Sequence, residues 1–115
     1  MRDFQLDKLR WGVLGSGEIA TVFCQALQVS QTGTLQAVAS AYTQGAQHLS
    51  QRFGGARYYF DYQALLEDHN VEAVYIANLN MDHAHWAIRA ARAGKHILIE
   101  KPLAISVQEV ERVIT

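Results

Sequence analysis

Gly15, Gly17 and Ala20 stand at a spacing that can bind phosphate, in the stretch Gly-Ser-Gly-Glu-Ile-Ala that follows an apolar run ending at Leu14. Gly15 allows a tight turn after a strand, and the absence of a side chain at Gly17 lets a pyrophosphate approach the backbone. Ala20 is small enough for a helix to pack closely on the strand, and the first amides of that helix would face the phosphates. The G-x-G-x-x-A spacing therefore predicts a dinucleotide-binding turn. The alternative is a glycine turn that only joins a strand to a helix.

A second chemically informative group, Glu100-Lys101-Pro102, lies at the end of the last apolar run of the chain. Ligands of open α/β sheets bind beside the carboxyl ends of the strands. A lysine at this position would therefore place an ammonium group at the mouth of the cleft. Taken alone, the tripeptide fits better with a strand that reaches the surface and is stopped by Pro102.

Five apolar runs alternate with helical patterns and must position these groups. The runs predict strands at Arg10–Leu14, Thr34–Ser40, Arg57–Phe60, Ala73–Ala77 and His96–Glu100. Strands that alternate with helices predict a parallel sheet with helices on both faces, and right-handed crossovers give the strand order 3-2-1-4-5. The predicted fold class is α/β: a doubly wound parallel sheet, or Rossmann fold, in three α/β/α layers.

Helical spacing predicts the faces and the ends of the helices. After the glycine turn, the apolar residues that share one face are Ile19, Val22, Phe23 and Ala26. Thr43 and Asp61 can cap the next two helices, and Gly54-Gly55 ends the first of them. Met81–Ala93 reads as an alanine-rich helix.

Composition limits the class of protein. A length of 115 residues with 50% hydrophobic residues suits one domain with a real core, which we assign to residues 1–115. The formal charge of -1 gives no electrostatic basis for binding nucleic acid or an anionic membrane. The single cysteine, Cys24, fits a reducing compartment and is expected in the core. With neither a signal peptide nor a membrane-spanning run, the sequence predicts a cytoplasmic protein.

Taken together, the WGVLGSGEIA and AGKHILIEKPLA segments resemble the N-terminal domain of the glucose–fructose oxidoreductase/inositol dehydrogenase/MocA family. The resemblance covers the chain from Leu9 to Thr115. It implies NAD(P)-dependent hydride transfer on a sugar, polyol or dihydrodiol-like alcohol. It also implies that Lys101 is the catalytic residue, touching the cofactor ribose and the reacting hydroxyl, where its charge would favour the developing alkoxide.

The resemblance implies further residues that contact the cofactor. Family members carry a T-P-N-x-x-H-like segment after the fourth strand, and this chain matches it at Asn80 and His83 but departs from it at Asn78 and Leu79. The complete expected cofactor set is Gly15, Ser16, Gly17, Glu18, Ile19, Ser40, Ala41, Tyr42, Asn78, Asn80, His83, Glu100, Lys101 and Pro102. We expect no metal site, because the histidines lack the spacing of a ligand set.

The choice between NAD and NADP depends on the end of the second strand. An acid there would hold a ribose 2′-hydroxyl and an arginine would accept a 2′-phosphate. The chain has Ser40-Ala41-Tyr42-Thr43 and therefore neither signal. Because no carboxylate would repel a phosphate, the sequence favours NADP slightly.

The family's C-terminal substrate domain is expected to be absent from these residues, so the chain alone is expected to be inactive. Two other functions are consistent with a glycine turn: a dinucleotide-sensing regulator that performs no catalysis, and a methyltransferase-like domain. The active-site lysine of Glu100-Lys101-Pro102 argues against both. An uncovered apolar edge at His96–Glu100 predicts self-association, and thus a homo-oligomer.

Overall fold

The computed structural model describes residues 8–40, 44–77 and 83–99. Its centre is a parallel sheet of five strands: β1 (Leu9–Leu14), β2 (Gly33–Ala39), β3 (Arg57–Tyr59), β4 (Ala73–Ile76) and β5 (His96–Ile99). The strand order is β3-β2-β1-β4-β5, which confirms the predicted topology. Leu14, at the end of the central strand, pairs with Ala39 on one side and Ile76 on the other.

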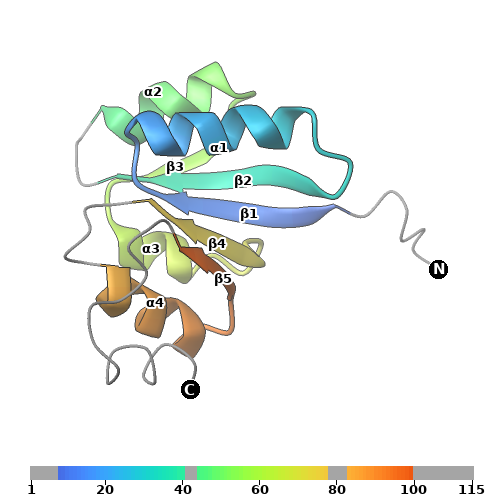
Figure 1. Ribbon diagram of the computed structural model, residues 1–115. Coiled ribbons are helices and arrows are strands. Elements are labelled where there is room, and N and C mark those ends of the chain that lie inside the picture. Colours follow the sequence, from blue (N-terminus) through green and yellow to red (C-terminus); the bar gives the residue numbers. More distant parts are fainter. Residues whose placement is uncertain (1–7, 41–43, 78–82, 100–115) are drawn as a thin grey trace.

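Helices cover both faces of the sheet (Figure 1). α1 (Glu18–Gln28) and α2 (Gly45–Arg52) lie on one face, and α3 (Tyr62–Leu66) and α4 (His83–Arg92) lie on the other. Alternate residues of a strand point to opposite faces. Val13 accordingly packs with residues of α1 and α2, whereas its neighbour Leu14 packs with residues of α3 and α4. The predicted three-layer architecture follows from this alternation.

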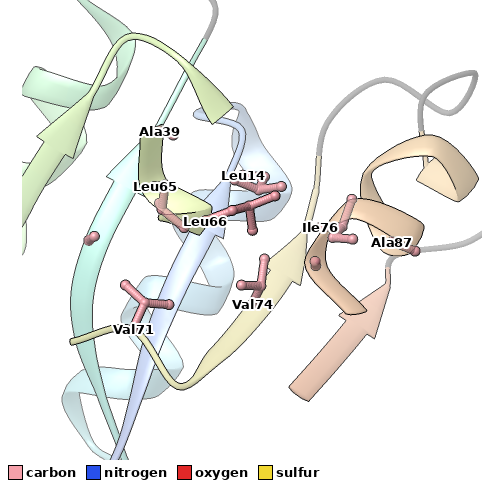
Figure 2. Close-up of a cluster of buried hydrophobic side chains, with 10 residues drawn as sticks. Leu14, Ala39, Leu65, Leu66, Val71, Val74, Ile76 and Ala87 are labelled. Atoms are coloured by element: carbon pink, nitrogen blue, oxygen red, sulfur yellow. The ribbon is translucent and has the colours of Figure 1, made fainter. Parts of the chain in front are cut away.

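The face that carries α3 and α4 contains a cluster of fully buried aliphatic side chains (Figure 2). Leu65 and Leu66 of α3 pack there with residues of the central strands, namely Leu14, Ala39, Val74 and Ile76. All four residues of β4 are buried. The unbroken apolar run therefore marks a strand that is covered on both faces, as its sequence predicts.

The face of α1 that meets the sheet differs from the predicted one. Ala20, Cys24 and Leu27 are buried, whereas Ile19, Val22 and Ala26 are exposed. The small Ala20 lies against the sheet directly after the glycine turn, and this contact rotates the neighbouring branched residues outward. Of the predicted set only Phe23 packs inward, where its ring stacks on that of Tyr75 with centroids 4.1 Å apart.

The helix ends largely follow the predicted signals. The Asp61 side chain caps α3 by accepting a hydrogen bond from the Gln63 amide at 3.0 Å. α2 instead begins after Gln44, which makes no side-chain cap bond, and Thr43 lies outside the described residues. Beyond α2, Gly54 and Gly55 both have a positive φ, so glycine is needed at this stop.

Within the part of the chain that the structure describes, every helix is too short or too polar to cross a membrane.

Leu65 of α3 offers a direct test of the packing on the face of the sheet that carries α3 and α4. Its side chain is fully buried, so Leu65→Ala should lower the free energy of unfolding by about 2–5 kcal/mol through lost contacts and a residual cavity. Val22→Ala is the matched control, because Val22 is 54% exposed and should change stability by no more than about 0.5 kcal/mol. Denaturant unfolding of both variants would measure the difference, and equal losses would contradict this packing.

Candidate functional site

The glycine turn lies at the carboxyl edge of the sheet, where β1 passes into α1 (Figure 1). Gly15 follows β1 and adopts a φ of 122°, a conformation that side chains rarely tolerate. Its amide donates a hydrogen bond to the Ala39 carbonyl at the end of β2, at 2.8 Å. The turn is therefore held against the neighbouring strand from its first residue.

Gly17 has a different reason to be glycine. Its φ of -79° and ψ of -165° are extended values that any residue adopts. Apart from its two chain neighbours, no atom of the described residues lies within 4 Å of a Cβ added at Gly17, so their packing does not exclude a side chain either. The described residues leave open the space beside Gly17, where the sequence predicts a pyrophosphate.

The residues around Gly17 form an accessible helix start. Gly17, Glu18 and Ile19 are exposed, and Gly17 is the N-cap of α1. The Thr21 amide donates to the Gly17 carbonyl at 3.0 Å, and the Thr21 hydroxyl donates to the same oxygen. Because the first amides of a helix have no intrahelical acceptor, they can bind an anion in the open space.

Ser40 lies behind the turn and is almost completely buried, with 1% of its surface exposed. Its hydroxyl oxygen is 2.9 Å from that of Ser16, and its amide donates to the Tyr59 carbonyl of β3. The structure thus brings the predicted residues of the β1 and β2 ends together, with Ser40 directed at Ser16.

The other predicted cofactor residues follow β4 and β5. Ala77 donates its amide to the Leu14 carbonyl at 2.9 Å, and Ile99 pairs with Ile76. β4 and β5 therefore end at the same edge of the sheet as β1, where the glycine turn lies. Of the predicted residues, His83 begins α4, and those outside the described residues are Ala41, Tyr42, Asn78, Asn80, Glu100, Lys101 and Pro102.

Sequence reasoning missed Gly45, the first residue of α2. A Cβ on Gly45 would lie 2.3 Å from the Ser16 hydroxyl oxygen and 3.0 Å from that of Ser40. The segment around Gly45 carries no signal of this contact, because the partners belong to the ends of two earlier strands.

Two other features have structural explanations. Burial raises the pKa of the Cys24 thiol to about 12, so Cys24 is a core residue and not a nucleophile.

A hollow of about 590 Å³ lies between α3 and α4 at the amino ends of β4 and β5. Arg89 and Arg92 stand in the last turn of α4, where cations stabilise the helix dipole, and Arg89 also donates to the Gln63 side chain. The Lys95 ammonium donates to the Asp68 and Val71 carbonyls. The described residues contain no group of three or more potential metal ligands.

Comparison with known proteins agrees with this geometry. Residues 9–115 match the model of the GFO/IDH/MocA family, described as an oxidoreductase family with an NAD-binding Rossmann fold. An uncharacterized oxidoreductase of Rhizobium meliloti is 44% identical over 110 residues, which are 95% of this chain and 33% of that protein. The myo-inositol 2-dehydrogenase of Thermotoga maritima is 31% identical over 106 residues, 92% of this chain and 32% of that protein.

A solved structure is also similar. The 3-ketoreductase of Actinomadura kijaniata, in complex with NADP and TDP-benzene, has a TM-score of 0.89 and 38% sequence identity. The match covers 94% of this chain and 33% of the reductase, so the chain spans about a third of the length of such relatives. The chain belongs to the GFO/IDH/MocA oxidoreductase family and corresponds to its NAD-binding Rossmann domain.

Proposed function

We propose that residues 15–19 bind the pyrophosphate of NADP, and that this domain serves an oxidoreductase acting on a sugar, polyol or dihydrodiol-like alcohol. In such a reaction a hydride passes between the alcohol carbon and the nicotinamide, and the hydroxyl loses a proton as the carbonyl forms. The other two thirds of the relatives' length has no counterpart among these 115 residues. We therefore expect a further domain of the complete protein to supply most substrate contacts.

Gly17 is the observation that carries the binding proposal. Neither its backbone conformation nor its surroundings exclude a side chain. Gly15 differs, since its positive φ alone accounts for glycine. A glycine that neither its backbone conformation nor the packing of the described residues requires is explained by a ligand that must approach the backbone.

The end of β2 supports NADP over NAD. The chain has Ser40 where NAD-binding folds place an acid that holds the ribose 2′-hydroxyl, and no carboxylate follows before Thr43. Because the Ser40 hydroxyl is buried against Ser16, the preference rests on the missing acid and not on a hydrogen bond from Ser40. The similar ketoreductase was solved with NADP.

Lys101 is the proposed catalytic residue of the complete protein. It follows β5 by two residues, and β5 ends at the carboxyl edge of the sheet, as β1 does. An ammonium group beside the reacting hydroxyl would stabilise the negative charge that develops on oxygen as the hydride leaves.

Gly17→Ala and Gly17→Val test the binding proposal. Each variant should lower the melting temperature only slightly, through a poorer N-cap, because a Cβ at this position meets none of the described residues. The affinity for NADP should fall by about tenfold or more, or about 1.4 kcal/mol, with valine the more severe change. Calorimetric titration and thermal melting would measure both quantities, and parental affinity in the valine variant would show that the turn is only structural.

Lys101→Ala tests the catalytic proposal in the complete protein with its substrate domain. Charge stabilisation that matters only in the transition state affects kcat more than ground-state binding. We expect kcat to fall strongly while the affinity for NADP changes little. An unchanged kcat would remove Lys101 from the chemistry.

Self-association of the 115-residue chain is a further expectation. β5 is the last strand of the described sheet and pairs with β4 alone, and its Leu98 is 46% exposed. Because an apolar edge strand invites pairing with another chain, sedimentation velocity should show oligomers that increase with concentration. Leu98→Lys should weaken this association. Val22→Lys is the matched control, because it adds the same charge at an exposed position of α1, and it should weaken association less. A monomer at all concentrations would contradict the expectation.

A further inference from the structure

We propose that Ser16, Ser40 and Gly45 form a serine latch that fixes the glycine turn relative to α2, and that Gly45 is a positioning residue for dinucleotide binding. This inference rests on the proposed function of the turn. It gives Gly45 and the Ser16–Ser40 pair a role in positioning the turn, which the G-x-G-x-x-A spacing does not predict.

The first part of the latch is the hydrogen bond between the two hydroxyl groups. Ser16 is the residue between Gly15 and Gly17, and Ser40 is the first residue after β2. Their oxygens are 2.9 Å apart, and Ser40 is 99% buried. The pair is partly shielded from water, because Ser40 is buried and Ser16 is half-buried, and reduced exposure to water strengthens a hydrogen bond.

The second part is the close approach of α2. A Cβ on Gly45 would lie 2.3 Å from the Ser16 oxygen and 3.0 Å from the Ser16 Cβ. Gly45 does not have a positive φ, so its backbone does not require glycine. Glycine is also a poor helix former, and at the start of α2 it is explained by the space that the two serines occupy.

The consequence concerns the position of the turn. The Gly15 amide is hydrogen-bonded to Ala39 at the end of β2, and the Ser16 hydroxyl is hydrogen-bonded to Ser40, the residue that follows Ala39. The start of α2 packs against the Ser16–Ser40 pair. Because Ser16 and Gly17 are adjacent in the chain, a displacement of Ser16 would also move the amide of Gly17. In this fold class the dinucleotide spans the ends of β1 and β2, and the latch therefore sets the distance between two walls of one binding site.

Gly45→Ala is the main test, measured by calorimetric titration with NADP and by thermal melting of the 115-residue chain. Alanine favours the helical state of α2, so a purely local effect would raise stability and leave binding unchanged. The latch predicts that the affinity for NADP falls about tenfold, because the new methyl group displaces Ser16.

The double variant Ser16→Ala/Gly45→Ala distinguishes the latch from a defect in α2. Removing the Ser16 oxygen removes the shortest contact of the new methyl group and leaves two of 3.0 Å, to the Ser16 Cβ and to the Ser40 hydroxyl oxygen, which small shifts would relieve. We expect the double variant to bind NADP more tightly than Gly45→Ala, although it carries one change more. If it binds no better, the loss does not pass through Ser16 and the latch is wrong.

If Gly45→Ala does not fold, the single variant Ser16→Ala still tests the latch. It deletes one oxygen from a half-buried residue and should lower NADP affinity severalfold with little change in melting temperature. Ser50→Ala is the matched control: Ser50 is also buried, but its hydroxyl donates to the Ala56 carbonyl, beyond the end of α2. It should lower the melting temperature and leave NADP affinity unchanged.

The outcomes separate this inference from the proposed function. If the parent chain binds NADP and both Ser16→Ala and Gly45→Ala bind it equally well, the latch is contradicted and the dinucleotide site stands. If the folded parent chain does not bind NADP, the proposed function itself fails.

Discussion

The chain reversal at Gly15 is the constraint on which the rest of the structure depends. With a φ of 122° and its amide bonded to the Ala39 carbonyl at 2.8 Å, Gly15 ends β1 and turns the chain back over the sheet within two residues. α1 can therefore begin at Glu18 with the fully buried Ala20 against the sheet. The same geometry brings the start of a helix to the edge where all five parallel strands end.

The features that sequence predicted well are those with a local physical cause. A strand covered on both faces must be apolar throughout, and β4 is. Asp61 caps α3 because a carboxylate before a helix meets unpaired amides, and Gly54 stops α2 because glycine tolerates a positive φ. Alternation of these elements along the chain was then sufficient for the strand order, since right-handed crossovers leave few alternatives.

The features that sequence predicted less well depend on tertiary contacts. Helical spacing allowed Ile19 and Val22 to face inward, but the close packing of Ala20 decided the rotation of α1 and left both exposed. The contact between the buried Ser40 hydroxyl and Ser16 joins the ends of two strands and gave no signal in the sequence, while contact of Ser40 with the cofactor stays a prediction. Gly45 gave no signal, because its reason to be glycine is the approach of Ser16, a residue of another loop. The candidate residues Asn78, Asn80 and Lys101 rest on the family resemblance, since they lie outside the described residues.

Chemical-shift mapping of the isotope-labelled chain during titration with NADP tests the central claim most directly, because it locates the ligand residue by residue. The account predicts saturable shifts concentrated on the amides of Gly15, Gly17 and Glu18, with Ser40 and Gly45 responding through the latch. The amides of Gly54 and Gly94, which lie beyond the helix ends, should not shift. Shifts confined to Arg89, Arg92 and Lys95 around the α3–α4 hollow, or no saturable shifts at all, would contradict a dinucleotide site at the glycine turn.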